Sequence, residues 1–201
     1  MKNLYGIDYG AKLAGTTVVA YSEGSGVRFC ASAKKQDADR FLLEFFAHRP
    51  PGKIFIDAPL SLPEVYCTGT ENLQEGKIPD FHYRACDREL GAMSPMFLGG
   101  LTARAMRLAF HLRKQGWEVH ETYPGALARM CGLQELGYKK SREGIAQCLE
   151  RLRERNEFLP EMQEIPGTWH QLDALLAFLS ACRADRGEAN ACGEEGALIW
   201  Y

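Results

Sequence analysis

The sequence predicts an α/β protein built around one mixed β-sheet. Three short runs, at residues 3–8, 16–21 and 27–32, are rich in apolar and β-branched residues and are separated by glycine-containing turns, which is typical of an antiparallel meander. After them, strand patterns alternate with helical patterns to the end of the chain. We therefore expect a single domain over residues 1–201, with a mixed five-stranded central sheet (antiparallel meander plus parallel strands) flanked by helices.

The later elements follow from their apolar spacing. Residues 36–48 repeat large apolar residues at helical intervals and are followed by two prolines. Residues 53–60 are almost continuously apolar, which is typical of a central strand buried on both faces. Residues 61–100 predict an irregular insert, with one short helix near 83–90, and connections of that length are often lids or binding loops. We further predict helices over 101–115, 125–131, 141–156 and 168–184, and strands over 118–123 and 197–201.

Composition excludes several classes of protein. No apolar run approaches the roughly 20 residues needed to cross a bilayer, and the N-terminus lacks the apolar core of a signal peptide. The seven cysteines are scattered without a C-x-x-C pair, which indicates buried thiols rather than zinc ligands or disulfides. We therefore expect a cytoplasmic protein with no membrane partner. The net charge of −2 does not support nucleic acid as a partner, so any such binding would need a local basic patch.

Two acids end or interrupt otherwise apolar strands. Asp8 closes the first strand, and Asp57 lies within the strand over 53–60. A buried carboxylate needs a hydrogen-bond donor, a cation or access to solvent. Each acid also has a purely structural interpretation, because Asp8 precedes a turn and Asp57 could accept a capping hydrogen bond. Taken singly, the two interpretations of each residue weigh about equally.

Asp173 lies in the apolar helix pattern WHQLDALLAFLSA. His170, three residues earlier, falls on the same helical face. The two residues could form a solvated face, with Asp173 favoured by the helix dipole. The small residues Ala174 and Ala177 favour instead a helix that packs close to the sheet and brings the acid to a site. Glu121, on a later predicted strand, is either a charge on an edge strand or a fourth acid of that site.

A meeting of these acids would require a cation. Several carboxylates in one place cannot all stay ionised without a positive charge between them. Oxygen ligands, with no cysteine and little histidine, favour Mg²⁺ or Mn²⁺ over zinc. Two such ions roughly 4 Å apart activate water and stabilise the leaving oxygen in phosphodiester cleavage.

The predicted short helix in the insert carries two arginines four residues apart, Arg84 and Arg88. Arginines at this spacing repel each other unless an anion lies between them. In one interpretation that anion is Asp87, on the same helical face. In the other, the two arginines bind a substrate phosphate.

Five pieces of the sequence, in this order, carry a resemblance: GIDYG at 6–10, IDAPLSLP at 56–63, RACDREL at 84–90, ETYPGAL at 121–127 and HQLDALLAFLSA at 170–181. The ordered set resembles domain-of-unknown-function family 429, predicted nucleases of ribonuclease-H-like fold. In that fold the first and fourth strands are neighbours, and a late helix packs its acid against their ends. The resemblance thus implies that Asp8, Asp57 and Asp173 meet, with Glu121 nearby.

The resemblance also implies a function, a metal-dependent nuclease. Asp8, Asp57 and Asp173 would act in catalysis by holding Mg²⁺ or Mn²⁺. His170 would complete the ligand set, because the late helix has one acid where related resolvases often have two. In the mechanism expected for such a nuclease, Glu121 or His170 would orient the attacking water as a catalytic residue, and Arg84 and Arg88 would bind the substrate phosphate.

Two other functions compete with the nuclease. The loop DYGAKLAGTT at 8–17 could wrap a phosphate, as in the related actin and sugar-kinase folds, although those proteins generally close two such domains over a nucleotide. A non-catalytic interaction module with a vestigial site is the third possibility. Serine hydrolase and Rossmann motifs are absent from the sequence. A test for metal binding would distinguish the interaction module from the other two functions. Turnover of DNA or RNA, compared with turnover of ATP, would then distinguish the nuclease from the phosphate-binding protein.

Overall fold

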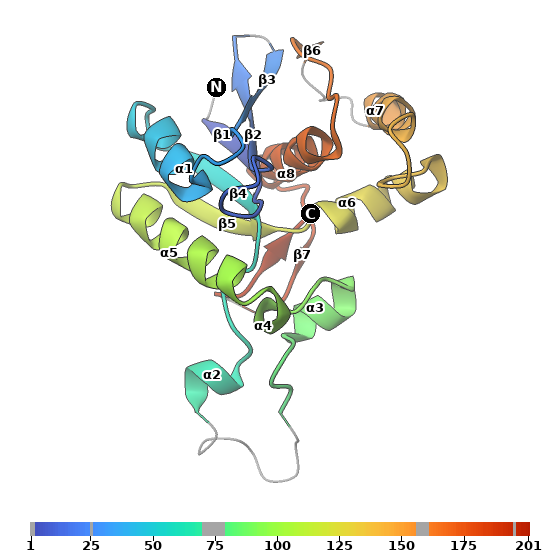
Figure 1. Ribbon diagram of the computed structural model, residues 1–201. Coiled ribbons are helices and arrows are strands. Elements are labelled where there is room, and N and C mark those ends of the chain that lie inside the picture. The colour runs from blue at the N-terminus through green and yellow to red at the C-terminus, as the bar shows by residue number, and fades with distance from the viewer. Residues whose placement is uncertain (1–2, 25, 70–78, 156–160, 195) are drawn as a thin grey trace.

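The computed structural model describes residues 3–24, 26–69, 79–155, 161–194 and 196–201 (Figure 1). Within them one mixed sheet has the strand order β6-β3-β2-β1-β4-β5-β8-β7. The strands are β1 (Leu4–Asp8), β2 (Val18–Glu23), β3 (Gly26–Ala31), β4 (Lys53–Asp57), β5 (Glu118–Thr122), β6 (Glu161–Met162), β7 (Ala191–Cys192) and β8 (Ile199–Trp200). The chain is therefore a mixed α/β protein, as predicted.

The prediction of five strands is wrong, because the sheet has eight among the described residues. The predicted meander is present as antiparallel β1, β2 and β3, and β4 and β5 run parallel beside β1. β8 lies within the strand predicted over 197–201, whereas β6 and β7 were not predicted; all three are two residues long and extend the sheet at both edges. The strands β6 and β7 arise from backbone pairing alone, and such short pairings leave no alternating pattern of side chains to recognise.

The helices lie close to their predicted positions. They are α1 (Ala38–Ala47), α2 (Val65–Thr68), α3 (Ala85–Leu90), α4 (Pro95–Leu98), α5 (Gly100–Lys114), α6 (Pro124–Met130), the 3-10 helix η2 (Leu133–Leu136), α7 (Gly144–Arg155) and α8 (Trp169–Asp185). The insert was predicted to hold one short helix near 83–90, which is α3, but it also contains the four-residue helices α2 and α4. Its residues 70–78 lie outside the described residues, as does the predicted end of α7 at Asn156. Thr168 and Gln171 form a capping box that fixes the start of α8.

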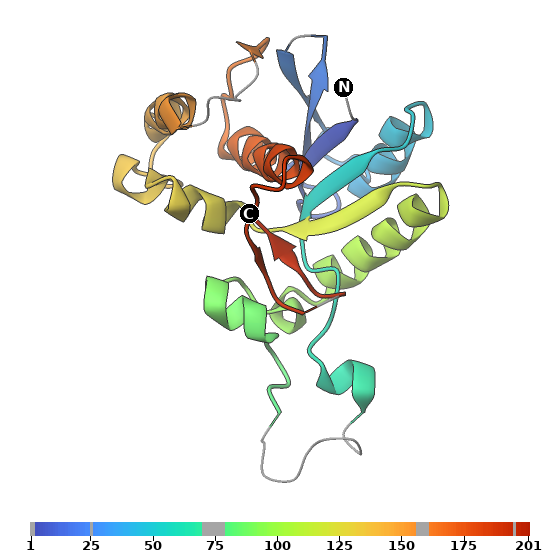
Figure 2. The same ribbon diagram turned by 180° about the vertical axis from the view of Figure 1, so that it is seen from behind.

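Helices cover both faces of the sheet. The two opposite views show α1 and α5 on one face, and α6, α7 and α8 on the other (Figures 1 and 2). In β1, Tyr5 and Ile7 pack in the core under α1 and α5. Because side chains alternate along a strand, Gly6 and Asp8 face α8 instead.

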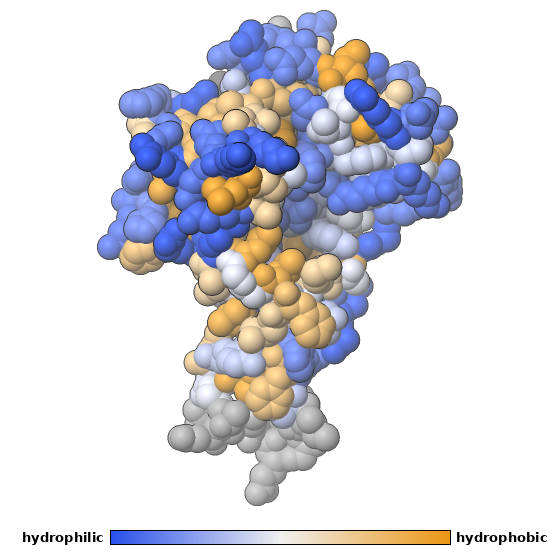
Figure 3. Space-filling model, viewed as in Figure 1, coloured by the Kyte–Doolittle hydropathy of each residue, from blue (hydrophilic) through white to orange (hydrophobic). Residues whose placement is uncertain are grey.

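The insert extends away from the sheet. In Figure 1, α2 lies well below the sheet, and the surface there is largely hydrophobic (Figure 3). Tyr66, Phe81 and Phe97 are among the large apolar side chains exposed in this region. None of the helices in the described ranges has the length and hydropathy required to cross a bilayer.

Candidate metal centre

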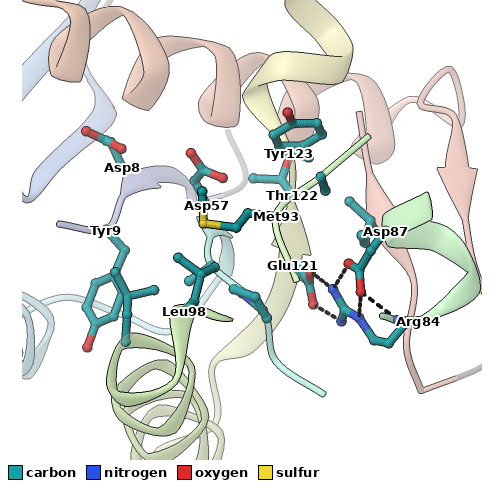
Figure 4. Close-up of a pocket in the computed structure, with 15 residues that line it drawn as sticks. Asp8, Tyr9, Asp57, Arg84, Asp87, Met93, Leu98, Glu121, Thr122 and Tyr123 are labelled. Atoms are coloured by element: carbon teal, nitrogen blue, oxygen red, sulfur yellow. Dashed lines mark hydrogen bonds and ion pairs between the residues drawn. The ribbon is translucent and has the colours of Figure 1, made fainter. Parts of the chain in front are cut away.

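The first two acids come together through strand pairing. β1 and β4 are parallel neighbours, and their register places Asp8 directly opposite Asp57. Ile7 and Ile56 belong to the core on the α1 and α5 side, so the next residue of each strand faces α8. In Figure 4 the carboxyl groups of Asp8 and Asp57 both point toward α8. The sheet thus presents two carboxylates side by side at its carboxyl edge.

The third acid is brought in by the close packing of α8 on β1. A Cβ atom placed on Gly6 would lie 2.0 Å from the backbone nitrogen of Phe178 and 2.4 Å from the carbonyl oxygen of Ala174. Glycine is therefore required at this position, because any side chain would push the helix away. Ala174 and Ala177 are fully buried, in agreement with the close packing predicted from their size.

Asp8, Asp57 and Asp173 form one cluster, which we call the acid cluster. One carboxylate oxygen from each lies within 4.8 Å of the others. Within the described residues, no hydrogen bond reaches the Asp57 carboxylate, and its burial, followed by the charges of Asp8 and Asp173, raises its pKa well above the usual range. Burial also raises the pKa of Asp173 against the opposing charge of Lys139.

Polar partners surround two of the three acids. His170 Nδ1 lies 2.7 Å from Asp8 Oδ2, and this hydrogen bond raises the pKa of the imidazole. Lys139 Nζ lies 2.7 Å from Asp173 Oδ2, and the Tyr138 hydroxyl donates to Asp173 Oδ1. His170 was predicted at this site, whereas Tyr138 and Lys139 were not. Their sequence, YKK at 138–140, reads as an exposed loop and gives no signal of a site.

Glu121 lies in a separate ion cluster with the predicted phosphate ligand Arg84. Arg84 Nη1 and Nη2 donate to the two oxygens of Glu121 at 2.7 and 2.6 Å. Arg84 Nη2 and Nε also donate to Asp87 at 2.6 and 3.1 Å, and Leu60 N donates to Glu121 at 2.8 Å. Burial raises the pKa of Glu121, and Arg84 opposes that effect. Every nitrogen of the Arg84 guanidinium is thereby engaged, and Glu121 is held by Arg84 and not by the acid cluster (Figure 4).

Arg88 lies apart from Arg84. Its Nη2 donates to Asp80 at 2.8 Å, and its guanidinium lies 3.6 Å from the centre of the Tyr83 ring. The Arg88 side chain is 60% exposed, while that of Arg84 is 5% exposed. The sequence allowed two interpretations of the arginines, an ion pair with Asp87 or binding of a phosphate. In the structure, Arg84 forms the ion pair with Asp87.

A cavity of about 230 Å³ connects the acid cluster with the ion cluster of Arg84, Glu121 and Asp87. Asp8 and Asp57 line it at one side and Arg84 and Glu121 at the other, with the apolar side chain of Met93 between them (Figure 4). At about 30 Å³ per water molecule, it has room for a hydrated ion or a phosphate group. It opens beside the carboxylates of Asp8 and Asp57.

Comparison with known proteins gives a family. The family model described as "Protein of unknown function (DUF429)" matches residues 99–197. The matched region includes Glu121, Lys139, His170 and Asp173, while Asp8 precedes it. A search of curated proteins found no match. The chain belongs to the DUF429 family of proteins of unknown function.

Proposed function

We propose that this chain is a metal-dependent nuclease of ribonuclease-H-like fold, which hydrolyses phosphodiester bonds in nucleic acid at the acid cluster. The observation that carries the proposal is the convergence of Asp8, Asp57 and Asp173, from two neighbouring strands and a late helix, within 4.8 Å. The meander, the parallel pairing of β1 with β4 and the packing of α8 on β1 support the fold assignment.

The residues of the acid cluster fit Mg²⁺ or Mn²⁺. These ions prefer carboxylate oxygens, which is the donor set that the three aspartates offer. Asp57 accepts no hydrogen bond within the described residues, and the nearby negative charges raise its pKa. A free, electrostatically strained carboxylate of this kind would gain most from a divalent cation. Asp8, Asp57 and Asp173 would hold the ion, and His170 lies within reach of the same place.

A divalent ion at this site would supply activation of water and stabilisation of the charge that develops on the phosphate oxygens. The protein's own residues have distinct tasks. His170 fixes the orientation of Asp8 through its Nδ1 contact, and its side chain is 48% exposed, so its other ring nitrogen can exchange protons with water. Arg84 fixes Glu121 at the wall of the cavity.

A local basic surface supports nucleic acid as the substrate despite the net charge of −2. The loops after β1 and after β3 both lie at the carboxyl edge of the sheet, beside Asp8. Backbone hydrogen bonds join them, from Lys35 N to Leu13 O and from Ala38 N to Lys12 O, each 2.9 Å. Lys34 and Lys35 are exposed there. Such a surface can contact the phosphates of a strand entering the site.

The phosphate-binding alternative has less support. In the loop over residues 8–17, the Gly10 N–H donates to Thr17 Oγ1 at 3.0 Å. The Thr17 side chain is fully buried. Two of the groups that would wrap a phosphate are therefore bound to each other.

A cleavage assay tests the proposal. End-labelled single-stranded DNA, duplex DNA and RNA are incubated with the protein in Mn²⁺, in Mg²⁺ or in EDTA, with ATP hydrolysis measured in parallel. We expect cleavage of a nucleic acid that requires metal and is lost in Asp57→Asn. The matched control Glu150→Gln, on α7, should cleave normally. Cleavage that persists in EDTA or in a folded Asp57→Asn protein would contradict the proposal, and hydrolysis of ATP alone would favour the phosphate-binding alternative.

A further inference from the structure

Lys139 has an unusual backbone conformation next to the acid cluster. Its φ angle is 58°, in the left-handed region that residues with a side chain rarely adopt. Gly137, two residues earlier, has a φ of 80°. Non-glycine residues in this region persist where the surroundings hold them, and they are found most often at functional sites.

This conformation directs two consecutive side chains to one carboxylate. In an extended chain, neighbouring side chains point in opposite directions. Here the Tyr138 hydroxyl donates to Asp173 Oδ1, and Lys139 Nζ contacts Asp173 Oδ2 at 2.7 Å. Hydrogen bonds from Tyr138 N to Leu133 O (3.1 Å) and from Lys140 N to Gly137 O (2.9 Å) fix the turn. The strained backbone thus holds an ammonium group against the acid cluster.

The ammonium group lies against one of the three carboxylates that would hold a metal ion. Its charge attracts Asp57 and Asp8 as well as Asp173. The oxygens of the acid cluster cannot hold both a divalent cation and an ammonium group in contact without strong repulsion between the cations. The Lys139 side chain is 51% exposed, and its flexible stem leads to solvent, so the ammonium group can leave without unfolding the site.

We propose that Lys139 is an internal counter-cation of the acid cluster, which a divalent metal ion must displace in order to bind. The inference rests on the proposed metal site and adds to it a residue that sets the affinity. Without metal, Lys139 offsets the negative charge of the three aspartates. With metal, the ammonium group moves to solvent, and the work of displacing it weakens binding.

The test is calorimetric titration with Mn²⁺ alone, in the absence of nucleic acid. The proteins are wild type, Lys139→Met, Lys139→Gly and Lys139→Arg, with Lys140→Met as the matched control. Lys140 is the next residue and is exposed, with no ion pair to the acid cluster within the described part of the chain. Lys139→Gly also removes the charge, and glycine adopts the left-handed backbone conformation readily. The test therefore remains valid if Lys139→Met does not fold.

We expect Lys139→Met and Lys139→Gly to bind Mn²⁺ at least tenfold more tightly than wild type, while Lys139→Arg and Lys140→Met stay within twofold of it. In EDTA, Lys139→Met should melt at a lower temperature than wild type, because the acid cluster then lacks its counter-cation. Equal or weaker Mn²⁺ binding by both folded neutral variants would overturn the role of Lys139 and leave the metal site standing. Absence of Mn²⁺ binding in every protein would overturn both. Tight binding without any nuclease activity would uphold Lys139 and reject the proposed function.

Discussion

At the scale of single residues, Asp57 is the acid of the cluster whose charge is least compensated. It faces two other carboxylates, and no hydrogen bond within the described residues stabilises its charge. The raised pKa means that the folded protein holds the Asp57 proton more tightly than the unfolded chain does. A carboxylate that faces two like charges without a hydrogen-bond donor is destabilised in its ionised form.

The metal-free protein should therefore lose stability as the pH rises. Between the ordinary aspartate pKa of about 4 and the raised pKa of Asp57, the folded state binds more protons than the unfolded state, so the free energy of unfolding falls with increasing pH. We expect Asp57→Asn to flatten this slope and to stabilise the metal-free protein at neutral pH by on the order of 1 kcal/mol, because it removes a charge that Asp8 and Asp173 repel. Urea denaturation in EDTA at several pH values measures the effect, and a less stable Asp57→Asn protein at neutral pH would contradict it.

The two predicted phosphate arginines should differ sharply when they are mutated. Arg84→Met leaves Glu121 and Asp87 buried without their partner, and breaking such a buried pair typically costs about 3–5 kcal/mol. Arg88→Met, on the same helix, removes an exposed pair with Asp80, for which less than about 1 kcal/mol is expected. Chemical denaturation of the two variants measures the difference. Similar small losses in both would show that Arg84 is not a structural ion-pair partner.

The sequence predicts some of these residues and not others. Asp8, Asp57 and Asp173 stand out because each is an acid within an apolar run. Glu121 was recognised only as an acid on a predicted strand. Its partner depends on where the insert places Arg84, which no periodicity encodes. Lys139 reaches Asp173 through a left-handed backbone conformation, and a run of two lysines in a loop gives no sign of that.

At the scale of elements, the acid cluster depends on how closely α8 approaches β1. The meander and the long helices are predictable because their side chains repeat with the period of a strand or a helix. The two-residue strands β6 and β7 are not, because only backbone pairing defines them. The close approach itself has a visible signal in the small residues of α8, while the need for glycine at position 6 appears only with the structure.

Gly6→Ala should therefore disturb both stability and the site. The new Cβ would meet backbone atoms of Phe178 and Ala174, which cannot move without shifting the helix that carries Asp173. We expect a loss of about 1–3 kcal/mol and at least tenfold weaker Mn²⁺ binding in the folded protein. The control is Gly100→Ala at the start of α5, where an added Cβ meets no atom within 4 Å. Normal Mn²⁺ affinity in Gly6→Ala would show that the position of α8 does not govern the site.

At the scale of the whole molecule, the distribution of charge matters more than its sum. The net charge is −2, yet exposed lysines lie on the joined loops beside Asp8, at the same edge of the sheet as the acid cluster. The opposite end of the sheet, where α5 ends, also carries cations (Figure 1). If nucleic acid is the substrate, its binding should depend on the lysines of the loops beside Asp8 and not on the cations at the end of α5.

Reversing the charge of one lysine at each end of the sheet tests whether the two ends differ in nucleic-acid binding. We expect Lys34→Glu to weaken binding of labelled DNA in the Asp57→Asn background and to lower the slope of log affinity against log salt by about 1. Lys114→Glu, at the end of α5, makes the same change of charge and should leave both quantities unchanged. Fluorescence anisotropy over a series of salt concentrations measures them. Equal losses in both variants would indicate non-specific attraction and no defined surface.

The most direct test of the metal centre is a crystal soaked in Mn²⁺, with diffraction data collected at a wavelength where manganese scatters anomalously. We predict an anomalous peak bounded by the carboxylates of Asp8, Asp57 and Asp173, with Lys139 Nζ withdrawn from Asp173. An ordered acid cluster without any peak, and with Lys139 still in place at saturating Mn²⁺, would contradict the metal centre on which the proposed nuclease depends.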